Sequence, residues 1–395
     1  MIDERTLLIE ALTKADGLNP ETVSLLGGPS DEFTKIMTEA MAKCPSFQSI
    51  KGGVIHCPSV TVANIGEDEF MSRFSIRPLV KPDPALEVDW LLKTWRTRKT
   101  HGYHIAAIWG LSLPSAIRLN ETDTLQPFSE VPDCPFKRTI INRAKRTDSL
   151  VPWQSNAEWQ EPTAALVRVI PDWVYIQENP IPDAVQWFPT LDDIDFFAML
   201  TIQIGAPIVT GSGSALSDES LDLYSHHHAI YWEHPEVAPI IERVTELDPT
   251  LFINQREAFQ TLPKKWRQRL LRAAARFSLS QCRQEPVDKV LDLALAYEIV
   301  LSSDETNAGI SWKLAVRAAQ IIGGDIDKRI AIRDQVNAFY GVRSRASHGG
   351  DIKPSEDVVE HAADTFRRLF VRLVELRAEP NWKKIELEAL PANRP

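Results

Sequence analysis

The sequence predicts an α+β protein in which a mixed α/β N-terminal region precedes an all-helical C-terminal bundle. Short apolar runs alternate with turns that contain proline and glycine up to about residue 250. Long helical blocks bounded by proline and glycine follow from residue 263 onward. A chain of 395 residues also exceeds what one hydrophobic core usually organises, so we expect two or three domains.

The N-terminal region, residues 1–250, has the pattern of short strands joined by turns, with a subdomain boundary near residue 150. A helix is expected from Asp31, because Ser30 precedes it as an N-cap residue and the apolar residues that follow have helical spacing. Apolar runs bounded by turn residues predict strands, and the apolar segment after Pro189 predicts a helix. We expect strands at 54–55, 60–62, 74–76, 104–109, 164–170 and 173–176, and a helix at 191–202.

Two patterns in this region resemble ligand sites but are interpreted otherwise. The segment Gly211–Ser214 follows a short apolar run, but it lacks the Lys-Ser/Thr ending of a phosphate-binding loop, so we expect a flexible loop. The run His226–His228, with His234 nearby, has no carboxylate at helical spacing, and consecutive residues point in different directions. We therefore expect no metal site and no cofactor.

The C-terminal bundle, residues 263–380, is expected to follow a linker at 251–262 and to precede a tail at 381–395. Proline stands where the first turn of a helix tolerates it, and the pairs Gly323–Gly324 and Gly349–Gly350 stand where helices stop. The sequence predicts five helices. Their expected bounds are Pro263–Cys282, Pro286–Ser302, Ile310–Ile322, Asp327–Ser347 and Ser355–Arg377.

Composition restricts the class of protein. The net charge of -10 argues against a protein that coats nucleic acid through bulk electrostatics, so a nucleic-acid site must be a local basic patch. The four cysteines show no CxxC pairing, which indicates reduced, structural thiols. No stretch approaches the roughly 20 apolar residues of a membrane span, and Met1–Arg5 lacks the pattern of a secretory signal. We expect a cytoplasmic protein with no membrane contact.

The first helix of the bundle has a basic face in this acidic protein. No acidic residue occurs between Gln260 and Arg283. A solvated basic face is the simpler interpretation, and an RNA-backbone surface is the alternative that the absence of acids favours. The basic residues share a spacing of four, three and four: Lys265, Arg269, Arg272 and Arg276.

The end of the fourth helix carries an arginine and a histidine separated by four residues, Arg343 and His348. The same spacing occurs at Arg96 and His101, in a different setting that we assign to chance or surface structure. Histidine titrates near neutral pH and can act as base or acid, whereas arginine stays protonated and presents two donors to phosphate oxygens. A pair of these residue types can transfer a proton and bind a phosphate group, which is the chemistry that metal-independent attack of a 2′-hydroxyl on the adjacent phosphate requires.

The segment from Arg276 to Leu376 resembles the Apea-like branch of the HEPN families. In that branch, a helix ends in the pattern Tyr-x-x-Arg-Ser-x-x-x-His-Gly-Gly, which this chain matches at Tyr340, Arg343, Ser344, His348, Gly349 and Gly350. The segment Asp292–Glu298 resembles the apolar helix of the branch, and Leu314–Ala319 resembles its arginine-bearing third helix. The resemblance implies a ribonuclease site of Arg343 and His348 with supporting residues, which we expect to be Tyr340, Ser344, Arg345, Glu298 and Arg317.

Helix geometry constrains this pair. Five residues of a regular helix turn through roughly 500°, so the two side chains would point about 140° apart unless the helix ends near His348. The resemblance implies that two motifs face one another across a homodimer, which an isologous interface permits. An Arg-His pair that only caps helix carbonyls remains the alternative at the motif, and we expect Glu298 to pair with Arg317 in a structural role.

The leading hypothesis is a ribonuclease whose N-terminal two thirds recognise a trigger, substrate or partner. The resemblance suggests a toxin or an anti-phage defence effector, with RNA as substrate and an antitoxin or trigger protein as a further partner. Two alternatives stay open: a non-catalytic HEPN module that binds RNA or nucleotide, and a structural interaction protein.

Overall fold

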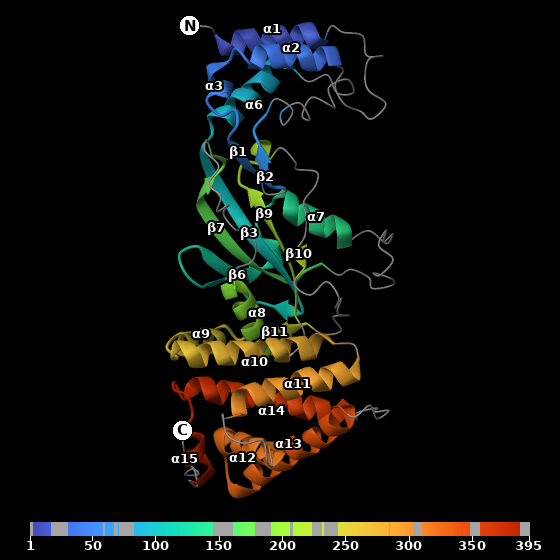
Figure 1. Cartoon of the computed structure of the whole chain (residues 1–395), viewed down its shortest axis with the longest axis vertical. Helices are drawn as coiled ribbons and strands as arrows, with labels where there is room; N and C mark the ends of the chain where they lie inside the picture. Colours follow the sequence, from blue (N-terminus) through green and yellow to red (C-terminus); the bar gives the residue numbers. More distant parts are fainter. Residues whose placement is uncertain are drawn as a thin grey trace.

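The computed structural model shows three parts stacked along the long axis: an N-terminal helical layer, a β-sheet region and a C-terminal helical bundle (Figure 1). The residues that the structure describes are 3–16, 31–57, 60–66, 70, 83–144, 161–177, 191–205, 208–222, 231–232, 244–283, 285–302, 310–347 and 356–387. The predicted α+β class is confirmed.

The N-terminal layer is built around buried aromatic residues. Phe47, Phe70 and Trp95 contact one another, with ring centroids 5.2 to 6.1 Å apart. A three-stranded antiparallel sheet in the order β2-β1-β8 adjoins this layer. The helices are α1 (Glu4–Asp16), α2 (Asp31–Met41), α3 (Pro45–Gln48) and α6 (Pro84–Arg96), and the strands are β1 (Val54–Cys57), β2 (Val60–Asn64) and β8 (Ile176–Gln177).

The central sheet has six antiparallel strands in the order β10-β9-β3-β7-β6-β5. Alternate residues of β3 serve two cores, as the two-residue period of a strand requires. Ile105 and Ala107 face the core that includes α7, whereas Ala106 and Ile108 face the core that includes α8 and α9. The bounds are β3 (Lys99–Trp109), β5 (Ile117–Arg118), β6 (Asp123–Pro127), β7 (Ala164–Val174), β9 (Val209–Leu216) and β10 (Tyr231–Trp232), with α7 (Pro135–Ala144), α8 (Leu191–Ile204) and α9 (Pro249–Gln260).

The expected flexible loop at Gly211–Ser214 was wrong, because this segment lies within strand β9 and pairs with β3. The glycines serve packing rather than flexibility. A Cβ at Gly213 would lie 2.3 Å from the ring of Phe136, so a larger residue there would displace α7. The expected strand at 74–76, and the histidines at 226–228 and 234, lie outside the described residues.

The five expected helices of the bundle are confirmed, each within two residues of its expected ends. They are α10 (Lys264–Cys282), α11 (Pro286–Leu301), α12 (Ile310–Ile322), α13 (Ile326–Ser347) and α14 (Glu356–Glu375). The segment expected as a linker is instead mostly helical, since Asp248 caps α9 by accepting from the amide of Leu251 at 3.0 Å. The expected tail contains the short helix α15 (Trp382–Leu387).

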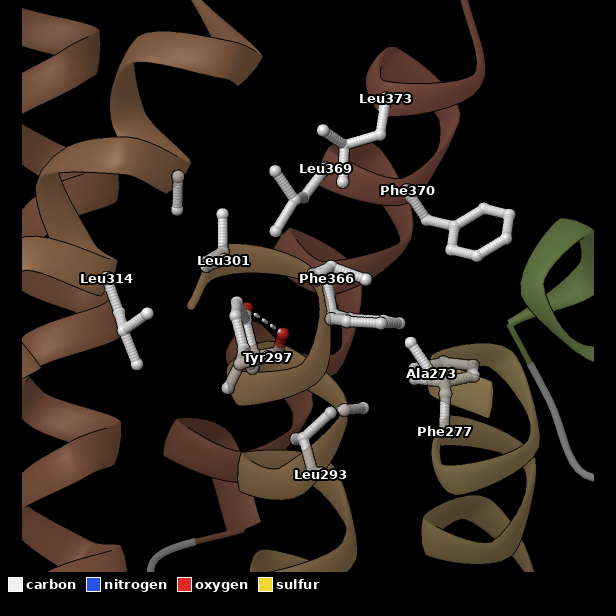
Figure 2. Close-up of a cluster of buried hydrophobic side chains, with 14 of the residues drawn as sticks. Ala273, Phe277, Leu293, Tyr297, Leu301, Leu314, Phe366, Leu369, Phe370 and Leu373 are labelled. Atoms are coloured by element: carbon white, nitrogen blue, oxygen red, sulfur yellow. Dashed lines mark hydrogen bonds between the residues drawn. The ribbon is translucent and has the colours of Figure 1, made fainter. Parts of the chain in front are cut away.

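Aromatic side chains fill the core of the bundle. Phe277 of α10 stacks on Phe366 of α14 with centroids 5.3 Å apart, and Tyr297 of α11 lies 5.1 Å from Phe366 (Figure 2). The Tyr297 hydroxyl donates to the carbonyl oxygen of Ala362 at 2.6 Å. Burial raises the pKa of Tyr297 well above its ordinary value, so this hydroxyl remains a structural donor.

Two further expectations concern cysteines and membranes. Cys44, Cys134 and Cys282 are buried thiols that are not joined in disulfides. Burial raises the pKa of the Cys44 thiol to about 11, so it stays protonated at neutral pH. Among the helices that the structure describes, none combines the length and apolar character needed to cross a membrane.

Candidate functional site

Arg343 lies in the penultimate turn of α13, which ends at Ser347. Its side chain is 40% exposed, so it does not belong to the apolar core of the bundle. Ser344 and Arg345 are exposed on the same turns, and the hydroxyl of Ser347 donates to the carbonyl oxygen of Arg343 at 3.0 Å. His348, the residue that follows this helix in the sequence, lies outside the described residues, as do the two glycines after it.

Arg343 forms an ion pair with Glu298 of α11, with 3.2 Å between Nη2 and Oε1. Glu298 is 24% exposed, so the pair is partly shielded from water. We expected Glu298 to pair with Arg317, but the structure places it against Arg343. The reason is that Glu298 and Arg343 come from neighbouring helices whose contact is not encoded in either local sequence. The carboxylate fixes the direction in which the guanidinium points.

Tyr340 lies one turn before Arg343 and is buried against α11. Its hydroxyl donates to the carbonyl oxygen of Ala294 at 3.4 Å, and its ring meets Tyr297 edge to face at 6.5 Å. Burial raises the pKa of Tyr340 well above its ordinary value, and the nearby charge of Glu298 raises it further. Tyr340 therefore stays neutral and supports the position of α13 rather than acting as a base.

Two arginines bind the carbonyl oxygens at the C-terminal end of α11 and have structural roles there. Arg317 donates to the carbonyl oxygen of Leu301 at 2.5 Å, and Arg269 donates to those of Ile299, at 2.5 Å, and Ser302. The last carbonyls of a helix have no partner within the helix, and the helix dipole favours positive charge there. These contacts account for both residues without an RNA ligand, so Arg317 is a capping residue of the bundle.

The four basic residues of the α10 stripe do not all remain available to a ligand. Arg269 is used at the end of α11, and Arg276 pairs at 3.0 Å with the buried carboxylate of Asp292. Lys265 and Arg272 are exposed, as is Lys264, which the predicted stripe missed. The surface that remains for a phosphate backbone is therefore narrower than the spacing of four basic residues predicts.

The arginine of the second Arg-x₄-His spacing, Arg96, has a structural role, in agreement with the prediction of surface structure. Arg96 pairs with Glu4 at 3.0 Å at the end of α6, and His101 lies exposed in strand β3. Burial opposes ionisation of Glu4, but the donors from Ser46 and Arg96 outweigh it and lower the pKa of Glu4. This pair therefore links α1 to α6.

The described residues include no group of three or more histidine, cysteine, aspartate or glutamate side chains placed to hold a metal ion. The site that the structure shows is a partly exposed arginine, oriented by a glutamate and backed by a buried tyrosine. Comparisons of the chain with protein-family models, with curated proteins and with solved structures found no match.

Proposed function

We propose that the bundle is a metal-independent endoribonuclease of the HEPN type, with Arg343 and His348 as its catalytic residues. The observation that carries this proposal is the state of Arg343. Its side chain is partly exposed near the end of a long helix, and His348 follows it five residues later in the sequence. The ion pair with Glu298 orients its guanidinium. A guanidinium held in this way can present donors to a phosphate.

The reaction needs a proton acceptor, a proton donor and positive charge near the phosphorus. The 2′-hydroxyl loses its proton to a base, its oxygen bonds to phosphorus, and the bond to the 5′-oxygen breaks as that oxygen takes up a proton. His348 supplies proton transfer near neutral pH, and Arg343 stabilises the negative oxygens of the crowded phosphorane. The products are a 2′,3′-cyclic phosphate and a 5′-hydroxyl.

The first prediction is that a chelator leaves RNA cleavage unchanged. The full chain, incubated with RNA in excess EDTA, should cleave at the rate seen without EDTA, because the proposed roles fall to side chains alone. The measurement is the loss of intact RNA with time. Cleavage that stops in EDTA and returns when a divalent metal is added in excess would contradict the proposal.

The second prediction concerns Glu298, which we assign as a positioning residue. Glu298→Gln removes a carboxylate that has two effects on Arg343. The carboxylate orients the guanidinium, and it also competes with the RNA phosphate for the same donors. We expect kcat to fall about tenfold because the guanidinium is less well placed, and KM for RNA to fall because a positive charge is released. Glu379→Gln is the matched control, since Glu379 also pairs with an arginine, Arg269, at 3.4 Å.

A purely structural Glu298 would give a different result. The melting temperature of Glu298→Gln would then fall, while kcat and KM of the folded protein stayed at wild-type values. Opposite changes in the two kinetic constants are the signature of an oriented catalytic arginine.

A homodimer supplies what one motif lacks, because a single motif has only one proton-transfer histidine. On α11, Leu291 and Leu295 precede Glu298 by seven and three residues and share its outward face. Both leucines are more than a third exposed although they are large and apolar. A second copy packed over this face would cover them and bring two Arg343 side chains toward one groove.

The third prediction is that the chain is a dimer and that Leu295→Glu makes it a monomer without cleavage activity. Light scattering should give twice the 44.5 kDa mass of one chain for the wild type. Leu251→Glu, at a leucine of α9 that is more exposed than Leu295, should remain dimeric and active. A fully active monomer would show that the composite site is wrong.

The remaining functional assignments are part of the same proposal. A cytoplasmic toxin or defence effector, restrained by an antitoxin or released by a trigger protein that the N-terminal region recognises, fits a bundle that cuts RNA. Lys265 and Arg272 would guide the RNA backbone, so cleavage should weaken as salt rises. RNA binding without turnover would instead favour a non-catalytic module, and neither binding nor turnover would favour a structural interaction protein.

A further inference from the structure

Helix α8 is buried in two cores at once. Phe197, Leu200 and Ile204 pack beneath the central sheet, whereas Ala198, Met199 and Ile202 belong to the core of the bundle. A helix that is apolar on opposite faces must be covered on both sides. The chain continues from α8 into strand β9 of the central sheet, so α8 is continuous with the sheet and packed into the bundle (Figure 1).

Arg367 of α14 holds the C-terminal end of α8. Its Nε donates to the carbonyl oxygen of Ile202 at 2.8 Å, and its Nη2 donates to that of Gln203 at 2.6 Å. Gly205 ends the helix with a φ of 62°, which favours glycine. A Cβ at this glycine would lie 2.3 Å from Arg367 Nη1. The guanidinium therefore packs directly against the backbone of Gly205, where no side chain intervenes. Its contacts hold α8 and α14 together at this point.

Close packing continues from Arg367 to the candidate site. Phe366, which precedes Arg367 on α14, contacts Tyr297 (Figure 2). The ring of Tyr297 in turn contacts that of Tyr340. Tyr340 lies one turn before Arg343 on α13. Each of these rings is buried, and buried side chains at native density move only together with their neighbours.

We propose that α8, clamped by Arg367, is the conformational link through which the sheet region controls the end of α13. A partner or ligand that displaces α8 at the sheet shifts Arg367, and the packed aromatic residues pass the shift to the turn that carries Arg343. This inference concerns how the parts move together and does not depend on whether the bundle cuts RNA.

Hydrogen exchange of the full chain, followed by mass spectrometry, tests the link. Arg367→Ala should raise the exchange rate of amides at 340–347 by about tenfold or more, together with those at the end of α8. Arg372→Ala is the matched control, because Arg372 lies on the same helix in an exposed pair with Glu375 at 2.7 Å. The control should exchange like the wild type at 340–347.

The exchange rate of the amides at 340–347 decides whether the link exists. Faster exchange confined to α8 and α14, with 340–347 at the wild-type rate, would overturn the proposal. If Arg367→Ala does not fold, Arg367→Lys replaces it, since lysine keeps the charge but lacks the fork that holds two carbonyls. Folded Arg367→Lys should show a smaller rise at 340–347, and an unchanged rate there with a loosened α8 would equally overturn the link. Because exchange is the readout, loss of the link is distinguishable from absence of RNA cleavage.

Discussion

Arg343→Ala and His348→Ala are each expected to cut RNA at least about 100-fold more slowly than the wild type, with the bundle still folded. Arg343 lies at the partly exposed end of α13, so its loss removes phosphate binding and charge stabilisation without opening a cavity in the core. Loss of His348 removes the proposed proton transfer. The measurement is the initial rate of RNA cleavage, with circular dichroism to confirm folding.

Arg96→Ala and His101→Ala are the matched controls, because they alter the same two residue types at the same spacing in a different setting. They should cleave at close to the wild-type rate. Cleavage at the wild-type rate by a folded Arg343→Ala or His348→Ala chain would contradict the assignment of the catalytic pair.

Phe366→Ala is expected to lower the free energy of unfolding by about 3 to 5 kcal/mol, the range for a large aromatic residue removed from a close-packed core. The Phe366 side chain is fully buried and contacts rings from α10 and α11, so no neighbour can fill the space without moving a helix. Urea denaturation followed by circular dichroism gives the change. Leu376→Ala, at an exposed leucine just beyond α14, should change the free energy by less than about 0.5 kcal/mol.

A loss below about 1.5 kcal/mol for Phe366→Ala would mean that the aromatic cluster is not the closely packed core described above. The same loss in both variants would point to an effect on the unfolded state rather than on packing.

The helices of the bundle were predictable because their signals are local. Proline in the first turn, glycine after the last turn and apolar residues at helical spacing all lie within the segment that they define. Strand β9 was not predictable in this way. Its alternating glycine and serine resemble a loop, and the Phe136 ring that requires Gly213 comes from a helix about 75 residues earlier in the chain. Helix α9 was missed for a different reason, since its N-cap Asp248 and its first-turn proline precede the segment 251–262, which was expected as a linker.

The candidate site was predictable only in part. The motif predicts Arg343, and the structure places it at the surface of the bundle, but the identity of its partner depends on how α11 meets α13. The basic stripe shows the same limit. Spacing alone treats Arg269 and Lys265 alike, whereas Arg269 is the one of these two residues that donates to a carbonyl oxygen of α11. Long-range contacts thus separate structural arginines from those left for a ligand.

The chemical nature of the cleaved ends gives the most direct test of the proposed mechanism. Purified full chain and the Arg343→Ala variant would be incubated in EDTA with an RNA of mixed sequence and with DNA of the same sequence, and the ends of the products would be identified. We predict that the wild type cuts only RNA and leaves a 2′,3′-cyclic phosphate, or its hydrolysed form, opposite a 5′-hydroxyl, and that Arg343→Ala leaves the RNA intact. Products with 3′-hydroxyl and 5′-phosphate ends, or cleavage of DNA, would contradict attack by the 2′-hydroxyl.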